Sequence, residues 1–389
     1  MAHDALVQTW RHRFPILATK TYLANHTLGA MPATVPAALQ EYAARWATDG
    51  VVAWDSWLPE IANVAAILED IIHAPRGSMT MAQNATNALA AVLSCLDFSG
   101  SRNRIIHASA EFPTVEYLLA GHRRYGADVV RLGDDPLQFP EDEILAAIDD
   151  RTRLVVISHV LFRTAQIIDV GPIVAKAHRH GALVALDAYQ SMGAVPFDVQ
   201  ELDVDVLIGG SVKWLCGGPG AGYLYVHPRL VGSLEPALAG WFSHASPFAF
   251  DPPPIRFAEG VARFTGGTPN IPAYYQAREG YRVIRETGVP AIREKSIRQT
   301  TLLVESAKAR GWKVVSPERA KQRGNHLTID PPHAAAVKDQ LIAMGTVVDH
   351  RPGAGIRLGP HFFTSDDECT AVLSQIDDIL AHLPPEAAP

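Results

Sequence analysis

The middle of the chain alternates short apolar runs with segments of helical periodicity. Near-continuous apolar runs are typical of strands covered on both faces. The predicted strands span residues 104–109, 128–132, 154–160, 183–187, 206–209 and 222–226. A helix is predicted over residues 171–180, with Gly181 just past its end. Alternating strands and helices favour right-handed crossovers and a mostly parallel sheet.

The pattern changes after about residue 255, where DPPPIRF forms a proline-rich bend. Residues 274–310 are mainly helical in pattern, and Gly288 and Pro290 predict a break into two helices. Ser365 and Glu368 have capping-box spacing before the last helix. We therefore expect a large α/β domain over residues 40–260, and a smaller α+β domain formed by residues 1–39 and 261–389.

Composition narrows the class of protein. The 389 residues suit two domains, and a net charge of −7 argues against nucleic-acid binding. No run of about 20 apolar residues lacks charges or breakers, so we expect no membrane-spanning helix. The N-terminal segment has no apolar signal core. Three cysteines give neither a disulfide framework nor a metal-ligand spacing, which favours a cytoplasmic protein without a metal site.

Two polar side chains follow predicted strands, at the edge where open α/β sheets bind ligands. Asp187 ends an apolar strand, and its carboxylate needs a partner or a cleft, although a helix cap is equally compatible with the position. Lys213 lies in the apolar, glycine-flanked segment VLIGGSVKWLCGG. Burial would lower its pKa and make it a nucleophilic amine suited to a Schiff base. A surface lysine lying along apolar neighbours is the alternative.

Three further segments suggest ligand contacts. QNATNAL, with Thr86, offers backbone N–H groups at a helix start as a phosphate site, or a plain N-cap. Phe112 is held extended by Pro113 at a strand exit, where it could stack on a planar ring or pack in the core. Arg357 lies in a β-like run and could bind a carboxylate through two hydrogen bonds, or form a surface salt bridge.

Taken in order, these segments resemble fold-type I pyridoxal 5'-phosphate (PLP) enzymes of the aminotransferase class V superfamily, and within it the kynureninase family. The resemblance covers nearly the whole chain. Its motifs are YLANHTLGAMP, EFPT, SHVLFRTAQIIDV, DAYQSMGAVPFDV, GGPGAGYLYVHPRL, GWFSHASPFAF, VARFTGGTPNI and IREKS. It implies a large domain with a mostly parallel seven-stranded sheet and a smaller α+β domain.

The resemblance also implies roles for individual residues. Lys213 would carry PLP as a Schiff base and move the Cα proton, and Asp187 would keep the pyridine nitrogen protonated. Phe112 would stack on the ring, and Arg357 would bind the substrate α-carboxylate. The remaining cofactor contacts would be Ala85, Thr86, Gln190 and Trp241, with Thr268 reaching the neighbouring subunit's phosphate in a homodimer. Asn25 and Trp57 would line the substrate pocket.

Three positions depart from the kynureninase pattern. Val212 stands where the family usually has a tyrosine, Gln190 where it has a histidine, and Val115 where it has an aspartate. Neither Val212 nor Gln190 can transfer protons near neutral pH. Hydrolysis of the Cβ–Cγ bond of kynurenine or a related amino acid is the leading hypothesis. The alternatives are another class V reaction, such as transamination, C–S or β-elimination, or epimerisation, and a non-catalytic PLP-fold protein.

Overall fold

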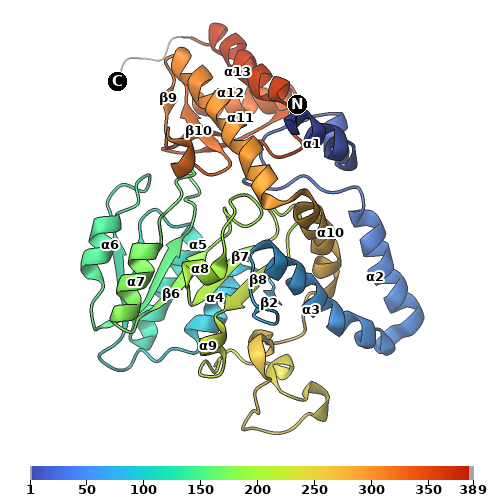
Figure 1. The fold of residues 1–389 in the computed structure, drawn as a ribbon, viewed down its shortest axis with the longest axis vertical. Coiled ribbons are helices and arrows are strands. Elements are labelled where there is room, and N and C mark those ends of the chain that lie inside the picture. Colours follow the sequence, from blue (N-terminus) through green and yellow to red (C-terminus); the bar gives the residue numbers. More distant parts are fainter. Residues whose placement is uncertain (1, 385–389) are drawn as a thin grey trace.

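A seven-stranded sheet forms the centre of the larger part of the protein, and the computed structural model describes residues 2–384 (Figure 1). β8 runs antiparallel to both of its neighbours, and the other paired strands are parallel. The mostly parallel α/β sheet is therefore confirmed. In spatial order its strands are β2 (Met79–Ala82), β8 (Gly222–Val226), β7 (Val206–Gly210), β6 (Leu183–Asp187), β5 (Thr152–Ser158), β3 (Arg104–Ala108) and β4 (Asp128–Leu132).

Helices cover both faces of this sheet, which explains its unbroken apolar strands. Along β5, Leu154 and Val156 pack with α4 (Ala85–Leu93) and α5 (Pro113–His122). The alternate residues Val155 and Ile157 pack on the opposite face with α3 (Trp54–Ile71), α7 (Gly171–Arg179) and α10 (Ile271–Thr287). Successive strand residues thus enter two different cores. Shorter helices are α6 (Glu141–Ala147), α8 (Val199–Leu202) and α9 (Pro228–Val231).

The seventh strand, β2, has no counterpart among the six strand ranges predicted from the sequence. It is a four-residue edge strand, MTMA, that pairs with β8 alone among the described strands. Its two methionines and single β-branched residue give little strand signal. The predicted strand 154–160 is also displaced, because the ladder of β5 with β6 ends at Ser158 opposite Asp187.

A smaller four-stranded antiparallel sheet packs above the large one in Figure 1. Its strands in order are β12 (Asp349–Arg351), β13 (Gly355–Leu358), β10 (Leu327–Asp330) and β9 (Lys313–Val314). Its core is shared with α11 (Val289–Ala309), α12 (Ala334–Ala343) and α13 (Asp366–Ala381). The predicted helix break at Gly288 and the capping box of Ser365 and Glu368 are both present.

The N-terminal segment lies against this smaller part. Its helix α1 (Ala2–Trp10) places Trp10 edge-on to Phe362, with the ring centroids 5.9 Å apart. β1 (Thr21–Tyr22) pairs in parallel with β11 (Thr346–Val347). More than 300 residues, including the whole of the large sheet, therefore lie in the sequence between these two paired strands.

The stretch Val35–Ile71 contains α2 (Val35–Asp49), a 3-10 turn over Gly50–Ala53, and α3. By length and composition this stretch could cross a membrane, whereas the sequence analysis predicted no such helix. Length and composition alone do not distinguish such a span from a helix of a soluble core. Here Glu41 on α2 and Glu60 on α3 form ion pairs of 2.6 and 2.7 Å with Arg278 on α10. These ion pairs show that α2 and α3 pack against α10 of the same chain.

Candidate active site

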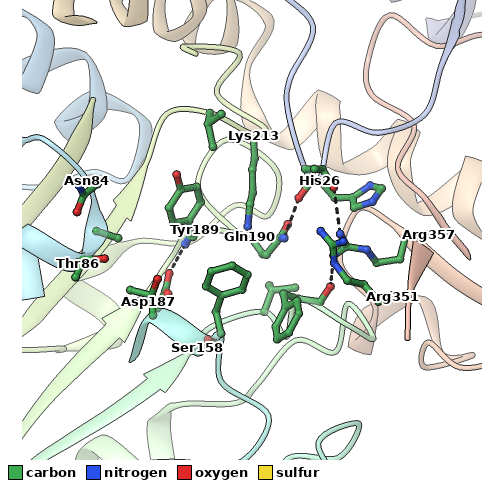
Figure 2. A pocket seen from close by; sticks show the side chains of 17 residues that line it. His26, Asn84, Thr86, Ser158, Asp187, Tyr189, Gln190, Lys213, Arg351 and Arg357 are labelled. Atoms are coloured by element: carbon green, nitrogen blue, oxygen red, sulfur yellow. Dashed lines mark hydrogen bonds between the residues drawn. The ribbon is translucent and has the colours of Figure 1, made fainter. Parts of the chain in front are cut away.

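One cavity of about 320 Å³ opens at the carboxyl ends of β5, β6 and β7, beneath the smaller sheet (Figure 2). This is the edge at which open α/β sheets bind ligands. Seven residues named from the sequence line the cavity, and they come from both parts of the fold: Ala85, Thr86, Phe112, Asp187, Gln190, Lys213 and Arg357. Segments separated by more than 250 residues therefore form one site.

Lys213 follows β7 on a turn that the N-terminal segment holds in place. The N–H of Gly29 donates to the carbonyl of Val212 over 2.7 Å. The Lys213 Nζ lies 4.4 Å from the centroid of the Tyr189 ring and 5.5 Å from that of Phe112. Burial lowers the pKa of Lys213 to about 7, although the Asp187 carboxylate opposes the change. The amine is thus available in its neutral, nucleophilic form near neutral pH.

This lowered pKa predicts how the cofactor-free protein responds to pH. Half of the amine is neutral at the pKa of Lys213, which is about 7, and the neutral fraction is nearly constant from about one pH unit above it. An ordinary lysine would continue to gain reactivity up to a pH near 10. We expect the rate of covalent attachment of PLP to level off by about pH 8. Stopped-flow absorbance against pH measures this rate, and a continued rise to about pH 10 would contradict the lowered pKa.

Asp187 ends β6 with its side chain buried and next to Lys213 in the cavity. Its Oδ1 accepts the N–H of Tyr189 over 2.8 Å, so the carboxylate also caps the local turn. Its Oδ2 accepts no hydrogen bond from the part of the chain that the structure describes. Burial raises the pKa of Asp187, and the Tyr189 N–H and the Lys213 charge oppose this effect. One carboxylate oxygen therefore remains available to a cationic ligand atom.

The start of α4 supplies an anion site. The Asn84 Oδ1 accepts the N–H of Asn87 over 2.9 Å, which makes Asn84 the N-cap. The next backbone N–H groups, of Ala85 and Thr86, belong to the first turn, where they have no partner within the helix. Both residues line the cavity. The predicted N-cap is therefore present, and the N–H groups of Ala85 and Thr86 stay candidates for binding an anion.

Arg357 on β13 brings a cation from the smaller sheet, and its side chain is almost fully buried. Its Nε donates to Asp349 over 2.6 Å, and its two terminal nitrogens donate to the Phe162 carbonyl and the Thr27 hydroxyl over 2.6 and 3.1 Å. Asp349 also contacts Arg351, with 3.0 Å between Oδ2 and a terminal nitrogen. These contacts fix the plane of the guanidinium group. Each terminal nitrogen keeps a second N–H for a ligand carboxylate.

The structure does not bring four of the named residues into this cavity within one chain. Asn25 is fully buried and links the N-terminal segment to the Gly359 carbonyl over 2.9 Å. Trp57 stacks on Tyr42 and shares a separate hollow with Thr268. The Trp241 Nε1 donates to the Thr268 hydroxyl over 3.3 Å, outside the lining of the cavity.

Gln190 lines the cavity, but its amide is already engaged. Its Nε2 donates to the His26 carbonyl over 3.0 Å, and its Oε1 accepts the indole N–H of Trp214 over 2.9 Å. Val212 also lines the cavity. Two of the three departures from the kynureninase pattern therefore lie in the cavity, and the third, Val115, does not line it.

Several cavity residues were missed from the sequence. Tyr189 follows Asp187 by two residues, and that spacing could have revealed it. Thr27 contacts Arg357, and Arg351 contacts Asp349. No local sequence pattern predicts these contacts. Ser158 lies beside Asp187 in the sheet and hydrogen-bonds Glu111, a buried carboxyl whose pKa burial raises to about 8.

PLP has an aldehyde, a basic ring nitrogen and a phosphate. The cavity has a group for each of these: a largely buried amine, a carboxylate at a strand end, and the N–H groups at a helix start. This combination is that of an enzyme that uses PLP. Residues 21–366 match the family model described as Aminotransferase class-V. The chain belongs to this family, and PLP is its cofactor.

Individual relatives and structural neighbours carry three different names. A kynureninase from Burkholderia pseudomallei (strain K96243) is 31% identical over 90% of this chain and 86% of its own length. A kynureninase from Pseudomonas fluorescens is 30% identical over 97% and 94%. The fold is similar to that of a cysteine desulfurase from Thermococcus onnurineus NA1, with a TM-score of 0.85 and 20% identity over 97% and 98% of the two chains. A cystine C–S lyase has a TM-score of 0.83 at 22% identity over 94% and 99%.

The residues of the cavity fit this cofactor. Lys213 offers the amine that binds the aldehyde, and the free Oδ2 of Asp187 suits a protonated ring nitrogen. The first turn of α4 suits the phosphate. The Phe112 side chain is 40% exposed, which leaves its ring open to a planar ligand. We infer that these residues hold PLP in this protein.

Proposed function

We propose that the protein hydrolyses the Cβ–Cγ bond of kynurenine or a related 2-amino-4-oxo acid, releasing alanine and an aromatic acid such as anthranilate. The observation that carries the proposal is its similarity to curated kynureninases, at 30–31% identity over 90–97% of the chain. The likeness to desulfurases and lyases, at 20–22% identity, concerns the fold.

The cavity suits such a substrate. Bound PLP supplies an electron-withdrawing ring that stabilises negative charge on the substrate. Arg357 would bind the α-carboxylate and so orient the amino acid, and Lys213 would take and return the proton at Cα. Phe112 and Phe162 form an edge-to-face pair with centroids 5.1 Å apart on the cavity wall. Such a wall suits an aromatic side chain.

The cysteines give no support to a reaction that needs a cysteine nucleophile. None of the three lies in the lining of the described cavity. Cys216 and Cys369 are buried, and burial raises the pKa of each thiol. Cys95, which is partly buried, has a pKa raised by burial to about 12. All three are therefore poor nucleophiles near neutral pH.

The test is direct. PLP-loaded protein is mixed with kynurenine, and anthranilate is followed by fluorescence while alanine is quantified separately. Equal amounts of the two products support hydrolysis. Absence of anthranilate at high enzyme concentration would overturn the proposal. A 2-oxo acid or ammonia formed from another amino acid in the same assay would then indicate transamination or elimination.

Replacing Arg357 tests the carboxylate site. Arg357→Lys keeps a cation near Asp349 but loses the planar pair of donors. We expect KM for the amino acid to rise about tenfold or more, with a smaller change in kcat. Lysine is preferred to alanine here because alanine would leave Asp349 buried without its main partner. Steady-state kinetics measure the effect, and an unchanged KM would refute the carboxylate role.

We further propose that two copies of the chain associate through an exposed apolar surface beside Thr268. Trp46, Val51 and Val52 are 63%, 81% and 60% exposed at the α2–α3 corner. Leu238 and Phe250 are 58% and 74% exposed, and the Phe250 ring stacks on Trp241 at 6.1 Å. Large exposed apolar patches are typical of protein interfaces. Thr268 lies in the hollow next to the α2–α3 corner, where a second copy could receive it.

A charge placed on this surface at the α2–α3 corner should prevent association. In Val51→Asp, a carboxylate would have to be buried without a partner in the interface. We expect light scattering to give the mass of a dimer for the unaltered protein and of a monomer for the variant. Tyr117→Asp, at a 75% exposed position on α5, is the matched control and should stay dimeric. Equal masses for all three proteins would argue against this interface.

A further inference from the structure

Tyr189 places a phenol in the cavity that the mechanism above does not use. Its ring centroid lies 4.4 Å from the Lys213 Nζ. Figure 2 shows it on the side of Lys213 that faces Asn84 and Thr86. The sequence reasoning assigned no role to this residue, although it lines the same cavity as the cofactor residues.

Two glycines show where the hydroxyl of Tyr189 points. A Cβ on Gly210 would lie 2.5 Å from this hydroxyl, and a Cβ on Gly222 would lie 2.6 Å from the Asn84 backbone. Gly210 and Gly222 are direct partners in the β7–β8 ladder. Opposed residues of an antiparallel pair point to the same face, with Cβ positions about 5 Å apart. The hydroxyl therefore lies on the sheet face next to the residue that begins α4.

The hydroxyl is free to donate a hydrogen bond. It makes none to the residues described here, whereas the backbone N–H of Tyr189 is bound to Asp187. Burial raises the pKa of the phenol to about 12, and the Asp187 charge adds to this, so the hydroxyl keeps its proton at neutral pH. The Tyr189 side chain is only partly buried, so its hydroxyl is accessible to a ligand in the cavity that can accept a hydrogen bond.

We propose that the Tyr189 hydroxyl donates a hydrogen bond to the phosphate of the cofactor. The proposal rests on the placement of PLP at Lys213 and the α4 N-terminus, and it does not depend on the substrate. Tyr189 then contacts the cofactor at two places, with its ring beside Lys213 and its hydroxyl beside the helix that receives the anion.

The experiment compares two ligands that differ only in the phosphate. Cofactor-free protein is titrated with PLP and with pyridoxal, and binding is followed by absorbance. In Tyr189→Phe the ring stays and the hydroxyl is lost. We expect affinity for PLP to fall about tenfold or more, as for hydrogen bonds to charged groups, and affinity for pyridoxal to change by less than about twofold. The ratio of the two affinities within each protein cancels any fraction that fails to fold.

Tyr225→Phe is the matched control. Tyr225 lies on β8 with a buried hydroxyl that has no hydrogen-bond partner among residues 2–384, and it does not line the cavity. Its PLP-to-pyridoxal ratio should equal that of the unaltered protein. Equal weakening of PLP and pyridoxal in Tyr189→Phe, or no weakening of either, would overturn the proposal. Because no substrate is turned over, failure to hydrolyse kynurenine would leave this result intact.

Discussion

Lys213→Ala is expected to lower kcat/KM by a factor on the order of 10⁴ or more, the largest loss from any single substitution in the cavity. The substitution removes both the covalent link to the cofactor and the group that moves the Cα proton. The protein should still fold, because the Lys213 Nζ donates no hydrogen bond to the described chain and lies against the Tyr189 and Phe112 rings. Steady-state kinetics and a thermal melt measure the two effects.

The Lys213→Arg variant tests whether the positive charge of Lys213 or its nucleophilic amine is needed. It keeps a cation beside Asp187 and loses the amine that can bind an aldehyde. We expect it to be as inactive as the alanine variant. Millimolar methylamine, an external amine, should restore part of the activity of Lys213→Ala, because the enlarged space admits a small base. Near-normal activity of either variant without added amine would contradict the role of Lys213.

Asp187→Asn should cause the second largest loss, with kcat lower by a factor on the order of 10² to 10⁴. The amide matches the carboxylate in shape, and its Oδ1 can still accept the N–H of Tyr189. The turn after β6 should therefore survive, with Tm shifted by only a few degrees. What is lost is the negative charge that holds a proton on the ring nitrogen of the cofactor.

Asp187→Glu is the control, because it restores the charge with an extra methylene in a buried site. It should recover more activity than the asparagine variant although it fits less well. If asparagine preserved kcat within about threefold, the charge of Asp187 would not be needed, and its part in the site would be limited to capping the turn.

The strand-end residues were the most predictable part of the site. Asp187 and Lys213 follow neighbouring parallel strands, and such strands end at one edge of a sheet. Pattern and topology therefore place them together without knowledge of any long-range contact. Thr86 was named on different grounds, the small polar residues that precede a helical run, and it lines the same cavity.

Contacts between distant segments were harder to predict. Arg357 was named, but no local pattern predicts that Asp349 and Thr27 hold its guanidinium group from two separate segments. Asn25 has an amide side chain that could bind a ligand, but in the structure this amide donates a hydrogen bond to the buried Gly359 carbonyl. A local motif cannot show whether a polar side chain faces a ligand or satisfies a buried backbone group.

Trp241 and Thr268 illustrate a different difficulty. They lie outside the cavity of their own chain and beside exposed apolar residues. Trp241 was expected to contact the cofactor of its own chain, whereas the predicted contact of Thr268 with phosphate depends on a second copy of the chain. A sequence describes one chain, so such a contact has no local signal.

Mapping the attachment site of the cofactor tests the central claim most directly. The PLP-loaded protein is treated with borohydride, which fixes the cofactor on the amine that holds it, and is then digested and analysed by mass spectrometry. We predict that the added mass is found on the peptide containing Lys213 and is absent from Lys213→Arg. Attachment to another lysine, or retention of the label in that variant, would contradict the assignment of this cavity as the active site.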